Sequence, residues 1–251
     1  MPMIKNLFLT VPILCLVSLF GAAQARPYPG PDLPQLYQHY LDVVNNIPAF
    51  DHHAHPGFAD LQGFGRRVIN LTIKELEANI AYQIGALQAI AALHGAKVTH
   101  MKPHGMMANM SAESAEMSEA ICRATKAVDR DLIFLAQANT EQGKAARKAG
   151  LRVAEEVFAD RTYTDAGFLT PRKEANSMIK DAAQAVAHVR RMVDEQAIYS
   201  TSGKRIPCQV DSICVHGDGP TAVTVSKAVR EGLEAAGIRI VPLPEMPNLK
   251  H

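Results

Sequence analysis

The sequence lacks the features that mark several classes of protein. Its 251 residues include four cysteines, and outside the apolar N-terminal run only Cys122, Cys208 and Cys214 remain. This odd number does not indicate a disulfide framework, and no C-x-x-C pair of the metal-binding type occurs. The 26 lysines and arginines nearly balance the 25 aspartates and glutamates, and no block of like charges occurs, which argues against a nucleic-acid partner. Neither G-x-x-x-x-G-K-[ST] nor G-x-G-x-x-G is present. A dedicated nucleotide-binding loop of either type is therefore excluded.

The N-terminal segment differs in composition from the rest of the chain. Lys5 precedes an apolar run that ends at Gly21, and Ala23 and Ala25 follow with the spacing of a cleavage site. This pattern predicts a secretory signal peptide over residues 1–25. The run is short and is interrupted by Pro12, so we expect no stable membrane span, which would need roughly 20 apolar residues.

The remaining chain divides into a connector and one large domain. Residues 26–46 are rich in proline and end in a short helical pattern, and residues 47–251 alternate strand-like and helix-like segments. Strands are predicted at 48–51, 97–101, 131–138, 151–159, 212–218 and 238–243, and helices at 72–93, 113–128, 140–149, 182–193 and 221–236. The polar break at 200–205 is typical of a hairpin turn. This alternation predicts an α/β domain with a parallel sheet, either a (β/α) barrel or a doubly wound sheet.

Polar side chains follow four of the predicted strands. In both architectures ligands bind at the carboxyl ends of the strands, so these residues are expected to share one rim. They are His52, His53 and His55, then Lys102 and His104, then Asp160 and Arg161, and finally His216 and Asp218. Glu155 and Glu156 are consecutive within a strand, so one of them points inward and the register decides which.

A metal site is an alternative interpretation of this rim. The spacing of His53 and His55 places two imidazoles on the same face of a strand, as hydrolases use for a divalent metal. The later strands add only His104 and His216 as histidine ligands. The sequence therefore leaves metal binding open.

Several motifs together resemble one known family. The segments AHPGFADLQGFGRR, YQIGALQA, HMKPHGMMANM, GLRVAEEVFADRTYTDAGFLTPR and CVHGDGP resemble the LamB/YcsF family over about residues 54–243. The resemblance implies an irregular (β/α) barrel of the glycoside hydrolase/deacetylase type. It also implies ATP-dependent opening of 5-oxoproline to L-glutamate by a 5-oxoprolinase, in which this chain is the A subunit beside subunits B and C. The family resemblance implies the cytoplasm, whereas the signal peptide implies export.

The N-terminal part departs from the family pattern. The D-L-N-x-D-x-G-E and N-x-A-C-G-x-H-A-G-D-P motifs of the opening strands are missing. Residues 36–56 look instead like the start of a metal-dependent amidohydrolase. The chain therefore resembles a join of two families near residue 54, and the barrel is expected to lack its first strands.

Three hypotheses of function follow. In the first, a 5-oxoprolinase subunit, Lys102 and Arg161 would neutralise a carboxylate or phosphate, and His104 and His216 would move protons, with Asp218 orienting His216. Further catalytic candidates are His55, Glu155 and Asp160. The second hypothesis is a metal-dependent amidohydrolase or deacetylase-like hydrolase that uses His53 and His55, and the third is an inactive truncated fusion.

Overall fold

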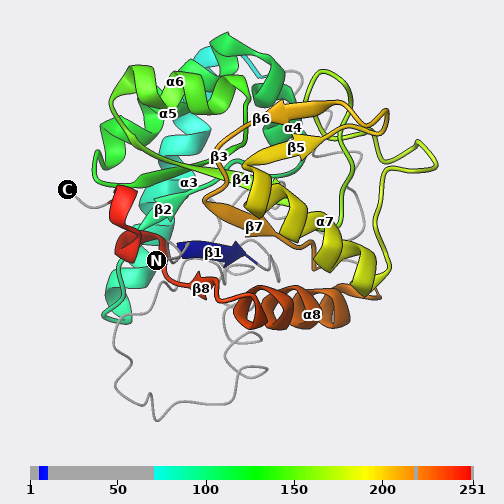
Figure 1. Cartoon of the computed structure of the whole chain (residues 1–251). Coiled ribbons are helices and arrows are strands. Elements are labelled where there is room, and N and C mark those ends of the chain that lie inside the picture. The colour runs from blue at the N-terminus through cyan, green and yellow to red at the C-terminus, as the bar shows by residue number, and fades with distance from the viewer. Residues whose placement is uncertain (1–5, 11–70, 218–219, 250–251) are drawn as a thin grey trace.

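The computed structural model describes residues 6–10, 71–217 and 220–249. Its main feature is a six-stranded parallel sheet in the order β2-β3-β4-β7-β1-β8 (Figure 1). The strands are β1 (Asn6–Thr10), β2 (His100–Met101), β3 (Ile133–Gln137), β4 (Arg152–Phe158), β7 (Ser212–Cys214) and β8 (Arg239–Ile240). A separate antiparallel pair joins β5 (Ala197–Tyr199) to β6 (Arg205–Pro207) around the expected turn. The prediction of an α/β fold with parallel strands is confirmed, and the sheet forms a half-barrel.

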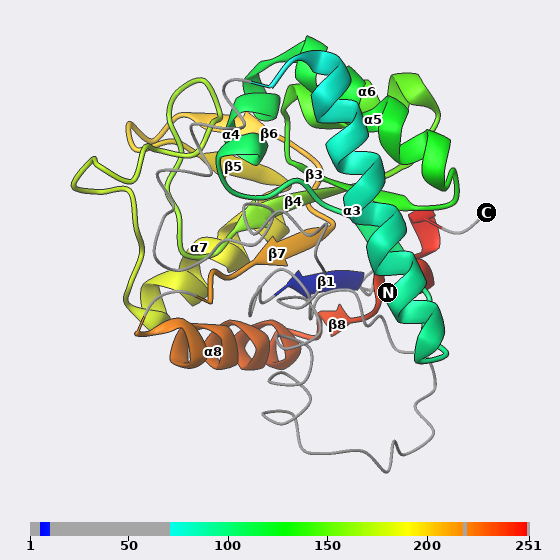
Figure 2. The same cartoon turned by 180° about the vertical axis from the view of Figure 1, so that it is seen from behind.

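Six helices accompany the strands in the described part of the chain. They are α3 (Ile73–Leu93), α4 (Gly105–Glu113), α5 (Ala115–Val128), α6 (Glu141–Ala149), α7 (Ala182–Glu195) and α8 (Ala222–Ala235). Helices α3, α5 and α6 pack beside one another, and α7 packs against α8 (Figure 2). In the described residues, no helix has the length and apolar character needed to cross a bilayer.

Local sequence explains where several helices begin and end. Thr72 and Glu75 form a reciprocal capping box at the start of α3, and the side chains of Ser114 and Asp181 cap α5 and α7. Helix α6 ends at Gly150, whose φ of 73° lies in the left-handed region that glycine adopts without strain. These signals are local, which is why the predicted helix boundaries agree with the structure to within a few residues.

Three apolar clusters bury the two faces of the sheet. One packs α3, α5 and α6 on strand β3 through residues such as Leu76, Ile121 and Phe134. Another packs α7 and α8 on strands β4 and β7, with Val157 and Ile213 at its centre. A third contains Ile133, Leu135 and Ala154 and is covered by the C-terminal 3-10 helices η1 (Leu243–Glu245) and η2 (Pro247–Leu249). The face opposite the α-helices is therefore filled near the amino ends of β3 and β4 and leaves room for polar groups near their carboxyl ends.

Strand β1 comes from the segment that composition assigned to a signal peptide. It lies between β7 and β8 and pairs in parallel with both (Figure 1). Leu7 is 1% exposed, belongs to the cluster under α7 and α8, and its carbonyl accepts a 2.9 Å hydrogen bond from the Val241 N–H. Cleavage after Ala25 would remove this strand and leave β7 and β8 without a partner between them. The predicted connector at 26–46 and the strand at 48–51 lie outside the described residues.

Helix α4 is absent from the sequence-based prediction. Pro103-His104-Gly105 is typical of a turn, and the methionines after it are expected to fill gaps in the core. In the structure Gly105 has a φ of 60° and begins the helix, so the turn and the helix overlap. Met107 is buried in the core as expected, whereas Met106 is 42% exposed.

Candidate functional site

Three of the predicted site residues follow the carboxyl ends of strands that lie among four adjacent strands of the sheet. Lys102 follows β2, Asp160 follows β4 and His216 follows β7. His104 immediately precedes α4 and interacts electrostatically with both Lys102 and His216. The parallel sheet therefore brings together four side chains that are as much as 114 positions apart in the chain. His53, His55 and Asp218 lie outside the described residues.

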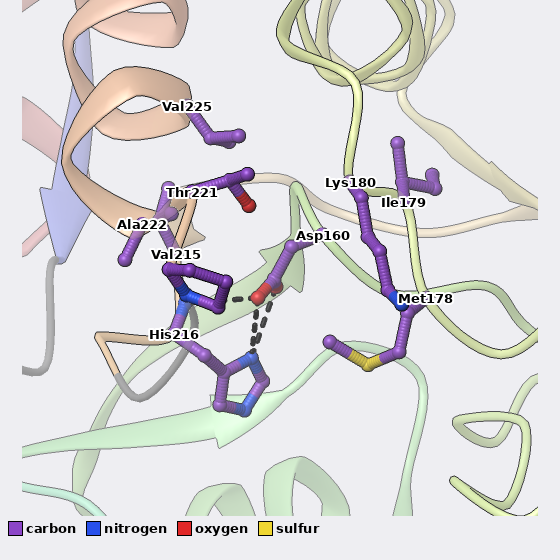
Figure 3. A pocket seen from close by; sticks show the side chains of 10 residues that line it. Asp160, Met178, Ile179, Lys180, Val215, His216, Thr221, Ala222 and Val225 are labelled. Carbon is purple, nitrogen blue, oxygen red and sulfur yellow. Dashed lines mark hydrogen bonds and ion pairs between the residues drawn. The ribbon is translucent and has the colours of Figure 1, made fainter.

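Asp160 and His216 form the tightest polar pair of this group. His216 Nδ1 lies 2.9 Å and 3.0 Å from the two carboxylate oxygens of Asp160, and the His216 backbone N–H donates to Oδ2 at 3.1 Å (Figure 3). Because a carboxylate only accepts, the proton of the neutral ring lies on Nδ1, and Nε2 is left with a free lone pair. Asp160 thus orients His216; Asp218, to which the sequence analysis assigned this role, lies outside the described residues. The arrangement is that of a histidine prepared to accept and return a proton.

Phe158 fixes the plane of the His216 ring. The two rings are stacked with their centroids 5.6 Å apart and their planes 18° apart. Phe158 also lies under the ammonium of Lys102, whose Nζ is 5.5 Å from the ring centroid. One aromatic side chain therefore contacts both the histidine and the cation.

Lys102 is paired with a residue that the sequence did not single out as catalytic. Its ammonium forms an ion pair with Glu156, whose carboxylate is 1% exposed and also accepts a 3.2 Å hydrogen bond from Ser212 Oγ. Burial alone would lower the pKa of Lys102, but the neighbouring Cys214 and Glu156 together raise it above its ordinary value. Lys102 is therefore a permanent positive charge beside His216, and it is held in place by Glu156.

The register of β4 decides between Glu155 and Glu156. Glu155 points to the helix-covered face, where Oε1 accepts a 2.5 Å bond from Arg147 Nη2 and Oε2 accepts a 3.3 Å bond from the Asn139 N–H. Glu156 lies on the opposite face, two and four positions before Phe158 and Asp160. Successive side chains of a strand alternate between its two faces, so residues 156, 158 and 160 are expected on one face. With Asp160 taken as a site residue, the sequence would therefore have favoured Glu156 over Glu155. Glu155, a candidate in the sequence, is not among the grouped residues.

The environment of His104 keeps its ring neutral. Burial, followed by the charges of Lys102, His216 and His100, lowers its pKa to about 3 from an ordinary value of 6.5. Its place at the amino end of α4 acts in the same direction, because that end of a helix disfavours a positive charge. At neutral pH His104 is thus suited to donating or accepting a hydrogen bond without becoming a cation.

Arg161 is turned toward a loop rather than toward this group. The side chain is buried, and its Nε and Nη2 donate to the carbonyls of Ser177 and Thr170 at 3.2 Å and 2.6 Å. Both carbonyls belong to the long connection between β4 and α7, residues 159–181, which is called the excursion below. These contacts show Arg161 anchoring that excursion to the end of β4.

A small pocket opens beside the Asp160–His216 pair. It has a volume of about 130 Å³ and lies between the residues that precede α7 and those at the start of α8. Asp160 and His216 border one side, and Met178 and Lys180 border the opposite side (Figure 3). Its other lining residues are Ile179, Val215, Pro220, Thr221, Ala222 and Val225. The pair is thus placed to act on a small molecule with apolar parts.

The metal interpretation gains no support from the described residues. Across 6–10, 71–217 and 220–249, no three histidine, cysteine, aspartate or glutamate side chains are grouped so that they could hold a metal ion. The proposed ligands His53 and His55 are outside these ranges. The described part of the site therefore offers acid–base and electrostatic chemistry from side chains.

Comparison with known proteins points to a single family. Residues 50–248 match the LamB/YcsF family. A protein from Rhodopseudomonas palustris (strain BisB18), named as the A subunit of 5-oxoprolinase, is 50% identical over 190 residues, which cover 75% of this chain and 74% of that protein. The protein of the same name from Azoarcus sp. (strain BH72) is 47% identical over 193 residues, with 77% and 75% coverage. The crystal structure of the lactam utilization protein from Thermus thermophilus superimposes with a TM-score of 0.66 at 39% identity, and 73% of each chain is covered.

Proposed function

The chain belongs to the LamB/YcsF family, and on this premise we propose that it is the A subunit of an ATP-dependent 5-oxoprolinase that opens 5-oxoproline to L-glutamate. The observation that carries the proposal is the Asp160–His216 pair, which lies beside a small pocket at the carboxyl ends of the strands. Relatives that cover three quarters of the chain carry this name, and a structural neighbour is named for lactam utilization.

The reaction needs both charge stabilisation and proton transfer. A lactam resists hydrolysis because amide resonance leaves its carbonyl carbon weakly electrophilic. ATP would supply a phosphoryl group to the lactam oxygen and so make the ring carbon reactive toward water. This chemistry places developing negative charge on oxygen, which fixed cations and hydrogen-bond donors stabilise.

The grouped side chains match these needs. His216, oriented by Asp160, takes the proton of the attacking water on Nε2 and returns it to the ring nitrogen as the C–N bond breaks, which leaves the phosphoryl group on the newly formed carboxyl group as an acyl phosphate. A second water would then cleave this acyl phosphate, and the products are L-glutamate and inorganic phosphate. Lys102, held charged by Glu156, does not line the pocket and would contribute a fixed positive charge to the site from its place over Phe158. His104 remains neutral and serves as a hydrogen-bonding group instead of a second cation. This assignment differs from the sequence-based hypothesis that His104 moves protons.

Subunits B and C complete the proposal. The relatives are named as one subunit among several, which denotes a protein that works in a multi-subunit enzyme. ATP would bind in the assembled complex, on this chain or on a partner subunit. A metal-dependent hydrolase built on His53 and His55 is the alternative, and no described residue favours it.

Site variants in the reconstituted complex test the proposal. Asp160→Asn leaves an amide that no longer holds the Nδ1–H tautomer of His216, so kcat for 5-oxoproline-dependent glutamate release should fall by about 100-fold or more. His94→Gln, at the exposed end of α3, is the control and should keep wild-type kcat. Urea unfolding should show that both variants are folded. Full activity of folded Asp160→Asn would contradict the assignment.

A further inference from the structure

The pocket beside the Asp160–His216 pair combines an apolar wall with charge at its two sides. Met178, Ile179, Val215, Ala222 and Val225 supply the apolar wall. Asp160 and His216 border one side, and Lys180 borders the other (Figure 3). A ligand that matches this pocket has an apolar middle and two different polar ends.

Lys180 supplies a positive charge to the lining of this pocket. The Asp160 carboxylate accepts from two donors of His216, the backbone N–H and the Nδ1–H, and the latter is shared between its two oxygens. Lys180 is exposed and borders the pocket on the side opposite the Asp160–His216 pair (Figure 3). The first turn of α8, at Thr221 and Ala222, places the positive end of a helix on the wall that faces Lys180 (Figure 3). The end of the pocket near Lys180 therefore favours a ligand with a carboxylate or a similar anion.

The size of the pocket limits the ligand. Its volume of about 130 Å³ is well below the roughly 300–1,000 Å³ of pockets that hold drug-sized molecules. A volume of this order suits a single five-membered ring.

We propose that this pocket binds the lactam substrate, with the Lys180 ammonium recognising the ring carboxylate and the Asp160–His216 pair facing the lactam group. The ring methylenes would pack on Val215, Ala222 and Val225, which are apolar and of matching size. This inference rests on the proposed function. It adds that Lys180 is the residue by which the enzyme selects a lactam that carries a carboxylate. Lys180 is a specificity residue and takes no part in the bond-breaking step.

Binding and turnover measured in parallel test the assignment. Calorimetry on the whole chain would use two probes, 5-oxoproline and 2-pyrrolidinone, which has the same ring without the carboxylate. The variants are Lys180→Met, which removes the charge at similar length, and Lys180→Arg, which restores it. Lys173→Met is the matched control, because Lys173 is an exposed lysine of the same excursion that does not line the pocket. Turnover of 5-oxoproline would be measured with each variant in the complex with subunits B and C.

Loss of a hydrogen bond between two charged groups should weaken 5-oxoproline binding by about tenfold in Lys180→Met. Its KM should rise by a similar factor while kcat stays within about twofold, and Lys180→Arg should recover most of the affinity. Binding of 2-pyrrolidinone should be the same in all variants. Unchanged affinity and KM in Lys180→Met, in a complex that turns over 5-oxoproline, would overturn this inference and leave the function standing. Absence of turnover by the wild-type complex would instead refute the function, and this inference with it.

Discussion

Breaking the buried Lys102–Glu156 pair should destabilise the protein more than loss of any exposed ion pair. The perturbation is Glu156→Gln, which keeps the shape of the side chain and removes its charge. Lys102 would then remain as a charge that is 12% exposed and has lost its carboxylate partner. Removal of one partner from a buried pair typically costs about 3–5 kcal/mol, because the other charge stays desolvated. Ser212 also loses a charged acceptor.

A double-mutant cycle separates the ion pair from other effects of the substitution. Glu156→Gln, Lys102→Met and the double variant would be unfolded with urea at pH 7. Lys102 has a folded-state pKa above its unfolded value, so the stability that it contributes is fully present at pH 7 and is lost only when the pH rises through the folded pKa. With a slope of roughly 2–3 kcal/mol per molar, the single Glu156 variant should lower the urea midpoint by about 1 M or more.

The double variant should cost less than the sum of the two single variants, since neither charge is then left alone. Glu119→Gln is the control, because Glu119 forms an ion pair with Lys148 on the surface, and its midpoint should be unchanged. Strict additivity of the two single variants would refute the reasoning, because it would show that Lys102 and Glu156 do not stabilise each other in the folded state.

Three further predictions concern other parts of the molecule. Leu7→Ala in β1 should lower the free energy of unfolding by about 3 kcal/mol. Leu93 is 83% exposed, so Leu93→Ala should lower it by almost nothing. Equal effects of the two substitutions would show that β1 is not part of the core. Arg161→Met should make the excursion before α7 more sensitive to limited proteolysis without lowering the urea midpoint of the sheet, and an unchanged cleavage pattern would contradict its anchoring role. Stability should fall as the pH drops from 6.5 toward 3, because the unfolded chain protonates His104 before the folded chain does. His104→Gln should flatten that slope in urea titrations.

The parts of the fold that follow local rules were predictable from the sequence. Apolar runs such as 131–138 became buried strands, and Gly150 ended a helix as its position implied. Helix α4 was missed because Gly105 marks a turn and a helix start at the same place. Strand β1 was missed because a short apolar run after a lysine has the composition of both a leader and a buried strand. Composition does not reveal a partner strand that lies more than 200 positions away.

The candidate site was predictable in its location and less so in its roles. The rule that ligands bind at strand ends identified Lys102, Asp160 and His216 correctly as neighbours. Sequence alone did not decide between Glu155 and Glu156, because that choice depends on register. Arg161 was expected to face the ligand, but nothing in the sequence reveals that two loop carbonyls receive its guanidinium. Lys180 was missed because it lies before a helix and not after a strand.

The central claim is that this chain opens 5-oxoproline in an ATP-dependent complex. The most direct measurement is the simultaneous release of L-glutamate and ADP from 5-oxoproline and ATP by the chain mixed with subunits B and C. The account predicts that both products appear together, and that neither appears above background when ATP, 5-oxoproline or this chain is left out. Glutamate release without ATP, or no glutamate from the complete mixture of folded subunits, would contradict it.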